Sequence, residues 1–331
     1  MKPSPLRGVN LGGWLVVEKW MTPSLFAGTT AHDQYSLVRS PGSATRLQAH
    51  YETFITEEDF MWLKKHSINA VRVPIGFWAL IDEPPLTNVR ERLDWLFAMA
   101  KKYDIAVLLC LHAARGSQNG SGHSGRAGEV EWYKPRKRRA ARQTLLQVAE
   151  RYSHHPNLWG IELLNEPRVK NFRQYCRLLC WSRRSVRQLR RQFPRLRVVY
   201  SDAFAPDKWS GKLSGVMDVH HYQTFSGVDK QLTIAGHLQK VADMTAKIAE
   251  WQRRQPVIIG EWSLGLDDLS LKGTPRGEVE KQFGAAQLRA YSAAAGWFFW
   301  NYKTEQADGW NYRHLIEADI LSGLTDEKVL E

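Results

Sequence analysis

The stretch Leu158–Pro167, LWGIELLNEP, is an apolar run that stops abruptly at Asn165 and Glu166. Bulky apolar residues followed by two polar residues and a proline are typical of a buried strand whose last side chains reach the rim of a sheet. Later in the chain, VIIGEW repeats this plan and carries Glu261 close to its end. The two stretches predict two buried strands that each deliver a glutamate to one edge of a sheet.

Strand patterns of this kind recur along the whole chain, and helical patterns separate nearly all of them. The predicted strands cover residues 6–10, 70–75, 105–111, 198–201, 216–220, 257–262 and 296–300, with one more beginning at Leu158; the predicted helices cover residues 56–65, 90–102, 138–152, 172–192, 236–253 and 278–293. Such alternation predicts a parallel sheet, and eight strands predict a closed (β/α)8 TIM barrel of the α/β class. An open doubly wound sheet is the alternative, but the glycine fingerprint of a dinucleotide or phosphate loop is missing.

Two segments of this pattern are predicted to be loops. A polar, glycine-rich loop is expected from residue 21 to about residue 53, and residues 113–134 form a second loop rich in glycine, serine and asparagine. The second is too long for a simple connection, so it is a candidate rim or lid of the barrel.

Length and composition limit the number of domains and the size of the core. A chain of 331 residues with 43% hydrophobic residues can bury a large core as one domain or two small ones. With the barrel pattern, we expect a single domain over residues 1–331. No apolar run has the length of a membrane span. Residues 1–5 lead almost directly into the first strand, so no secretory signal is expected.

Cysteine usage and charge exclude several classes of function. The three cysteines include no CxxC pair and no histidine-rich partner set, so we expect neither a metal site nor a disulfide framework, and no cofactor. The net charge of +12 is concentrated in residues 134–142 and 183–197, which are interpreted mainly as solvated helix faces of a monomer. Weak attraction to an anionic polymer or membrane surface is the alternative. No nucleic-acid module accompanies the charge.

The active site of a TIM barrel lies at the carboxyl ends of its strands. Polar or aromatic residues are predicted at or just past these ends: Asn10, Arg72, His112, Asn165, Glu166, His220, Tyr222, Glu261 and Trp300. A pair of carboxylates is what cleavage of a glycosidic bond requires, although each glutamate alone could simply form a salt bridge. Fourteen tryptophans, several of them beside these ends, favour a cleft that stacks on sugar rings.

Specific motifs extend this interpretation from one end of the chain to the other. The chain contains, in order, RGVNLGGWLVVEKWMTPSLF, VRVPIGFWAL, LHAARGSQNGSGHSG, LLNEP, HHYQTFS, GEWS and GWFFWNYKTEQADGW. In these motifs it resembles glycoside hydrolase family 5, and within that family the fungal-type exo-β-1,3-glucanases. The resemblance implies a retaining β-glucosidic hydrolase acting on β-glucans, with Glu166 as acid/base and Glu261 as nucleophile. The resembled proteins are mostly secreted, but the sequence itself assigns no compartment.

The same resemblance implies roles for the substrate-binding residues. Arg72 and Tyr222 would hold Glu261, Asn165 would contact the sugar 2-hydroxyl, His112 and His220 would line the reacting subsite, Glu18, Trp20 and Trp300 would enclose and stack the terminal sugar, and Asn119 would help to bind substrate. Phe225 would be one half of an aromatic gate at the cleft entrance. Ser121 stands where the resembled enzymes have the other aromatic residue.

Proton positions follow from these roles. A neighbouring Arg72 and a Tyr222 hydroxyl should lower the pKa of Glu261, while a second carboxylate and a partly apolar site should keep a proton on Glu166.

Glu18 beside Trp20 favours attack from a chain end. A glucan transglycosylase or a β-1,6- or β-1,4-glucanase of the same fold, a non-catalytic glycan-binding barrel, and a basic scaffold for a membrane-associated polysaccharide machine remain as alternatives.

Overall fold

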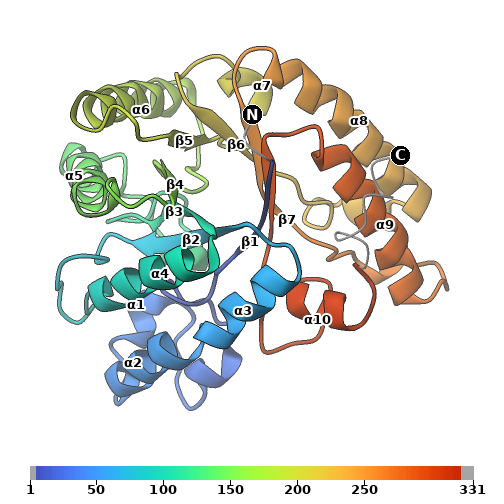
Figure 1. Ribbon diagram of the computed structural model, residues 1–331, viewed down its shortest axis with the longest axis horizontal. Coiled ribbons are helices and arrows are strands. Elements are labelled where there is room, and N and C mark those ends of the chain that lie inside the picture. The colour runs from blue at the N-terminus through green and yellow to red at the C-terminus, as the bar shows by residue number, and fades with distance from the viewer. Residues whose placement is uncertain (1–4, 322–331) are drawn as a thin grey trace.

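The computed structural model describes residues 5–321. Eight parallel strands form a closed barrel in chain order, and Figure 1 shows them at the centre of the molecule. They are β1 (Leu6–Asn10), β2 (Ala70–Gly76), β3 (Ala106–Ala113), β4 (Leu158–Glu162), β5 (Val198–Ser201), β6 (Val216–His220), β7 (Val257–Trp262) and β8 (Gly296–Phe299). The predicted (β/α)8 barrel is confirmed. Residues 1–4, which carry part of the expectation about a secretory signal, lie outside the described residues.

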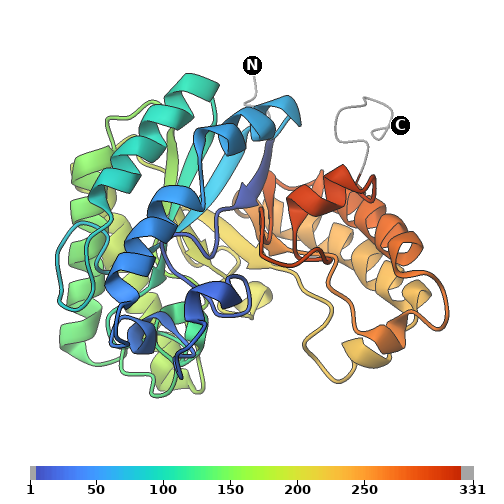
Figure 2. The ribbon, with the colours of Figure 1, turned by 90° about the horizontal axis from the view of Figure 1, so that it is seen from below.

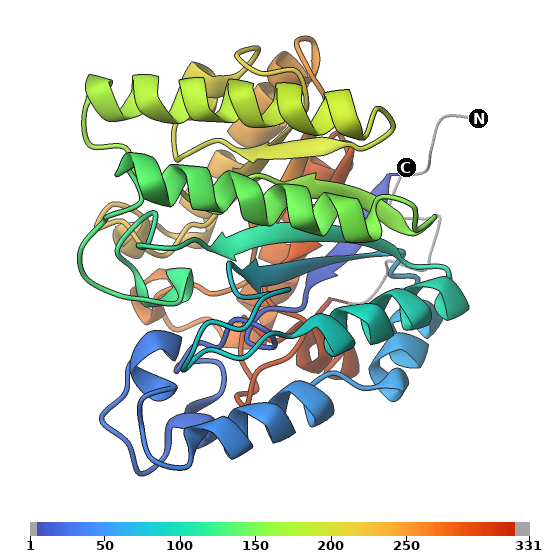
Figure 3. The ribbon, with the colours of Figure 1, turned by 90° about the vertical axis from the view of Figure 1, so that its left-hand side faces the viewer.

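Helices cover the outside of the barrel. The long ones are α3 (Glu57–Lys65), α4 (Arg90–Tyr103), α5 (Pro135–Tyr152), α6 (Phe172–Gln192), α8 (Ile234–Gln252) and α9 (Arg276–Tyr291). Figure 3 shows α5 and α6 side by side over the strands, and Figure 2 shows α8 and α9 on the opposite side of the molecule. Among residues 5–321, no helix is both long and apolar enough to cross a membrane.

The structure differs from the sequence prediction in two connections. The segment expected to be a loop up to residue 53 contains the helices α1 (Gln34–Leu37) and α2 (Ser43–Thr53). Helix α2 buries only Ser43, Leu47 and Tyr51, so its apolar face gives a weak periodic signal. Between β5 and β6 the only helix is the short α7 (Pro206–Trp209). This side of the barrel therefore lacks the long covering helix found elsewhere.

The interior of the barrel changes from apolar to polar along the strands. Its lower layer is a cluster of buried apolar residues made by Leu6, Ala70, Leu108, Val199, Val216, Ile258 and Phe298. Because side chains two residues apart in a strand point to the same face, the next interior positions on β2 and β6 are Arg72 and Asp218. The apolar layer thus supports a buried polar layer, which lies directly below the mouth of the barrel.

Candidate active site

Arg72 is the centre of the buried polar layer. It lies at the third position of β2, inside the barrel, and not at the strand end where the sequence analysis placed it. Its guanidinium is fully buried and donates hydrogen bonds to Glu162 (Nε to Oε2, 2.8 Å), Glu261 (Nη1 to Oε1, 2.9 Å), Asn10 (Nη1 to Oδ1, 2.9 Å) and Asn165 (Nη2 to Oδ1, 2.9 Å). Two of these partners are carboxyl groups, which offset the cost of burying the arginine charge.

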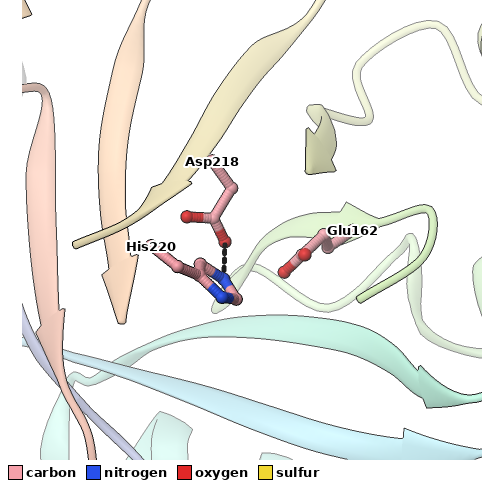
Figure 4. A group of neighbouring side chains, drawn as sticks. All are labelled: Glu162, Asp218 and His220. Carbon is pink, nitrogen blue, oxygen red and sulfur yellow. Dashed lines mark ion pairs between the residues drawn. The ribbon is translucent and has the colours of Figure 1, made fainter. Parts of the chain in front are cut away.

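Below the mouth, Figure 4 shows Glu162, Asp218 and His220 pointing toward one another. Asp218 Oδ2 lies 3.6 Å from His220 Nε2 and 3.4 Å from Arg72 Nε. Its other oxygen accepts a hydrogen bond from the Gly260 backbone N–H at 2.7 Å. Only glycine fits at position 260, because a Cβ there would lie 2.1 Å from Asp218 Oδ1.

This group has the donor atoms of a metal site, since one ligand atom from each residue lies within 4.8 Å of the others. The sequence analysis, which expected no metal, did not foresee that the fold gathers these side chains. The guanidinium of Arg72, however, already faces both carboxylates as their cation. The prediction that the protein needs no metal therefore remains a prediction, and Arg72 gives it a physical basis.

The two predicted catalytic glutamates meet at the mouth of the barrel, with His220 between them. His220 Nδ1 lies 2.7 Å from Glu166 Oε1 and 3.4 Å from Glu261 Oε2, and one ligand atom from each of the three residues lies within 4.8 Å of the others. The Tyr222 hydroxyl donates to Glu261 Oε2 at 2.9 Å. Two carboxylates with oxygens within 4.8 Å of each other are compatible with the roughly 5–5.5 Å separation of the carboxyl groups in retaining glycosidases.

Local backbone irregularities aim these side chains. The register between β6 and β7 shifts after Val219, so that His220 pairs with Glu261 across the two strands. Such a bulge turns side chains toward a new direction at the rim of a barrel. Glu166 lies past the end of β4 and has a left-handed backbone, with φ of 41°, directly before Pro167. Strained non-glycine residues of this kind cluster at active sites.

The pKa order of the two glutamates is the reverse of the sequence prediction. Burial raises the pKa of Glu261 to about 7, and the opposing charges on His220 and Arg72 do not offset it. Burial also acts to raise the pKa of Glu166, but the His220 hydrogen bond and the charge of His123 outweigh it and bring this pKa down to about 2. The reason is distance: His220 Nδ1 is closer to Glu166 than to Glu261. Without substrate, these pKa shifts favour a proton on Glu261 over one on Glu166.

A cavity of about 940 Å³ opens above these groups. Its volume lies at the upper end of the range for small-molecule sites and leaves room for more than one sugar ring. It is lined by the predicted site residues Glu18, Trp20, His112, Glu166, Tyr222, Phe225, Glu261 and Trp300, and also by Lys19, His32, Ser121, Gly122, His123, Phe204 and Trp310. The other predicted site residues, Arg72, Asn119, Asn165 and His220, are not part of this lining and act from behind it.

Glu18 and a group of aromatic side chains form one end of the cavity. Glu18 is buried, and its Oε2 accepts a hydrogen bond from Trp20 Nε1 at 2.9 Å. Its Oε1 accepts no protein hydrogen bond within the part of the chain that the structure describes. Trp310 packs edge-on against Trp20 at 5.6 Å, and Trp300 stacks on His112 at 5.4 Å. A carboxylate oxygen among flat rings is suited to hold a sugar.

The sequence analysis missed several residues of the site. His123 Nε2 lies 3.4 Å from Glu166 Oε2 and 2.7 Å from Asn119 Nδ2, so Asn119 reaches the site through His123. His123 lies in the predicted rim or lid loop of residues 113–134, which was the available signal. Trp310 was one of the tryptophans beside the strand ends that favoured a sugar cleft, but it was given no role of its own. Phe204 gave no signal, because it follows a short strand without a recognisable motif.

Comparisons with known proteins support the fold and the family resemblance. The family model described as cellulase (glycosyl hydrolase family 5) matches residues 32–193. A relative from Emericella nidulans named probable glucan 1,3-beta-glucosidase A is 34% identical and covers 98% of this chain and 91% of its own length. A glucan 1,3-beta-glucosidase from Blumeria graminis is 32% identical, covering 98% and 88%. The crystal structure of rutinosidase from Aspergillus niger superposes with a TM-score of 0.81 at 22% identity and covers 97% of this chain and 98% of that chain.

Proposed function

Because the chain belongs to glycoside hydrolase family 5, we propose that it is a retaining exo-acting β-1,3-glucosidase, with Glu261 as nucleophile and Glu166 as acid/base. The observation that carries this proposal is the arrangement of Glu166, His220 and Glu261 at the base of an aromatic cavity. One carboxylate oxygen or ring nitrogen from each of these residues lies within 4.8 Å of the others. The relatives named glucan 1,3-beta-glucosidases support the substrate class. We also propose that residues 1–331 form one catalytic domain.

In the first step, a Glu261 carboxylate oxygen bonds to the anomeric carbon while the bond from that carbon to the leaving oxygen breaks. Glu166 gives its proton to the leaving oxygen. The hydrogen bond between His220 Nδ1 and Glu166 Oε1, at 2.7 Å, is a route by which Glu166 receives that proton when substrate binds. In the second step, Glu166 takes a proton from water, the water oxygen bonds to the anomeric carbon, and Glu261 leaves as a carboxylate.

Tyr222 and Arg72 keep Glu261 oriented for this attack. Each donates to a different carboxylate oxygen of Glu261, at 2.9 Å in both cases. The nucleophile cannot rotate without breaking one of these hydrogen bonds. Pre-set donors of this type lower the reorganisation that the reaction requires. A sugar acceptor in place of water would give transglycosylation by the same steps.

Glu18 supports attack from a chain end. Glu18 lines the cavity, Trp20 donates to its Oε2, and its Oε1 has no protein donor from residues 5–321. Two hydroxyls of a terminal sugar could donate to such a carboxylate, whereas a continuing chain would offer fewer donors and need more space. The alternative is an open cleft that cuts within chains or that prefers β-1,4 or β-1,6 links.

The proposal is tested by incubating the protein with β-1,3-, β-1,4- and β-1,6-linked gluco-oligosaccharides of equal length. We expect glucose as the first product and the fastest release from the β-1,3 series. Proton NMR of the initial product should show the β-anomer, as retention requires. Binding without hydrolysis of any series would support the glycan-binding alternative, and an initial α-anomer would contradict the retaining mechanism.

A further inference from the structure

A second cavity, of about 730 Å³, adjoins the active-site cavity. Phe204 lines both of them. The walls of the second cavity come from residues 168–175, which follow Glu166 and Pro167, and from residues 203–212, which follow β5. The second cavity occupies the side of the barrel where the short α7 replaces a long helix. It therefore continues the site past the loop that carries Glu166.

Phe204 stands at the boundary between the two cavities in a constrained conformation. Ala203 and Phe204 both have left-handed backbones, with φ of 47° and 59°. The buried Asp202 accepts a hydrogen bond from the Phe204 N–H at 3.0 Å, and Ser201 Oγ accepts one from the Ala203 N–H at 3.1 Å. Phe204 nevertheless remains 62% exposed. Two adjacent strained residues that present an exposed ring indicate a functional position, because burial of the ring does not compensate for the strain.

The second cavity is basic and partly aromatic. Its exposed cations are Arg168, Lys170, Lys208 and Lys212. Among the residues that the structure describes, none of these four side chains forms an ion pair. The one acidic residue in the lining, Asp207, accepts a hydrogen bond from Trp251 Nε1 at 2.8 Å and pairs with Lys247. Four unpaired cations beside one engaged carboxylate leave an excess of positive charge in the cavity.

The location of these four cations relative to Glu166 indicates what they bind. This step rests on the proposed function, in which Glu166 protonates the leaving oxygen. The loop that continues from Glu166 then lies on the leaving-group side of the scissile bond, and that loop supplies Arg168 and Lys170. Phe204 offers an aromatic ring that lines both the active-site cavity and the second cavity. A glycan leaving the reacting subsite can stack on Phe204 and continue toward the cations.

We propose that the second cavity binds an anionic group, a carboxylate or a phosphate, carried by the leaving-group side of the glycan. The substrate class is then a β-glucan or β-glucoside with a charged aglycone. Exposed amines and one guanidinium suit such a group, since they can approach it from several directions and remain solvated when it is absent. A lipid surface fits less well, because the cations line a cavity that shares Phe204 with the active-site cavity.

The test uses β-1,3-gluco-oligosaccharides whose reducing end has been oxidised to a carboxylate. The same oligosaccharides reduced to neutral alditols are the matched controls, since both end in an open chain. We expect kcat/KM to be about fivefold higher for the acids than for the alditols at low salt, and high salt should remove the difference. Equal values at all chain lengths would overturn the proposal while leaving the hydrolase function intact.

A pair of variants locates the effect. The variant with Lys170→Gln, Lys208→Gln and Lys212→Gln should bring the ratio of acid to alditol kcat/KM to about one. A control with Arg184→Gln, Arg187→Gln and Arg191→Gln removes three exposed charges from α6 and should keep the ratio. A ratio near one in the control as well would show that the preference for acids depends on net charge alone, and would overturn the proposal.

Binding measurements make the test independent of catalysis. In an inactive Glu261→Gln protein, calorimetry should show the same preference for acids over alditols. A preference there without turnover by the wild-type protein would contradict the proposed function and still support the anion site. Competition by phosphate beyond that of acetate at equal ionic strength would identify phosphate as the natural group, and the opposite order would identify a carboxylate. Lysine-dependent binding to anionic vesicles without any preference for the acids would reassign the cavity to a membrane.

Discussion

The floor of the active-site cavity and its rim are built in opposite ways. The floor consists of Tyr222 and Glu261, with Arg72, Asn165 and His220 directly behind them. These residues belong to the barrel or follow its strands closely, and their side chains bond to one another. The rim, consisting of Trp20, Ser121, Phe204 and Phe225, comes from loops and is exposed. A rigid floor preorganises the chemistry, while loop residues select the glycan. Changes to the floor should therefore alter rate and stability, and changes to the rim should alter selectivity.

The largest effect should come from the nucleophile. Glu261→Ala is expected to lower kcat for a β-glucoside by at least about a thousandfold, because no other group can form the covalent intermediate. Azide should restore turnover of an activated aryl glucoside by attacking from the vacated side, and the product should be the α-glucosyl azide. Glu166→Ala with the same activated substrate is the control, since it should instead yield the β-azide. Near-normal turnover by Glu261→Ala would remove the central assignment.

Loss of the buried cation should come next. Arg72→Met leaves Glu162 and Asp218 without their cation inside the barrel, so the free energy of unfolding should fall by about 3–5 kcal/mol. Denaturant titration measures this change, with Arg184→Met on the exposed surface of α6 as control. A stability equal to that of the control would show that the floor does not depend on this arginine.

The pH dependence tests the shared proton. The active form needs one proton on the glutamate pair, and the pKa of Glu261, raised to about 7, marks its loss as pH increases. We therefore expect kcat/KM to fall about tenfold for each pH unit above about 7 and to stay level below it. An aryl glucoside whose leaving group needs no protonation should show a weaker decline. A rate that rises with pH through this range would contradict the shared-proton assignment.

The terminal-sugar end should give a smaller effect. Glu18→Gln keeps an oxygen for Trp20 but loses the charge that strengthens hydrogen bonds from sugar hydroxyls, so kcat/KM for oligosaccharides should fall by about 10- to 100-fold. Chromatography of early digestion products would show whether the variant also releases internal fragments. Internal fragments from the wild-type protein would contradict the end-acting model.

Removal of metal ions should have no effect. Arg72 serves as the cation beside Glu162 and Asp218, so treatment with a chelator should leave both activity and melting temperature unchanged. Measurement after gel filtration, with and without added divalent ions, is the check. Lost activity that a divalent ion restores would show that the gathered carboxylates do hold a metal.

Buried strands were predictable because each is a short apolar run bounded by polar residues, and β5 and β6 have the predicted limits. Helix α2 was not predictable, because only a narrow face of it packs against the core. Within the site, Glu166 and Glu261 stand out because each interrupts an apolar strand pattern near its end. Glu162 and Asp218 do so too, but strands buried on both faces carry no alternation that separates inward from outward positions.

The pKa order could not be predicted because it depends on where a third residue lies. His220 was expected near both glutamates, yet the difference between 2.7 Å and 3.4 Å decides which carboxylate it stabilises. His123 adds a second imidazole from a loop far away in the sequence. Distances of this kind arise from packing between β4, β6 and the loop of residues 113–134, and no local pattern encodes them.

The hydrogen bonds of Arg72 have a consequence for the catalytic cycle. When Glu261 becomes a glycosyl ester it gives up its negative charge, and the guanidinium loses one ionic partner. In this structure Glu162 and Asp218 also face Arg72, at 2.8 Å and 3.4 Å, so the guanidinium keeps two other carboxyl partners when Glu261 is esterified. The nucleophile can therefore change its charge during each turnover while the buried cation keeps partners inside the barrel.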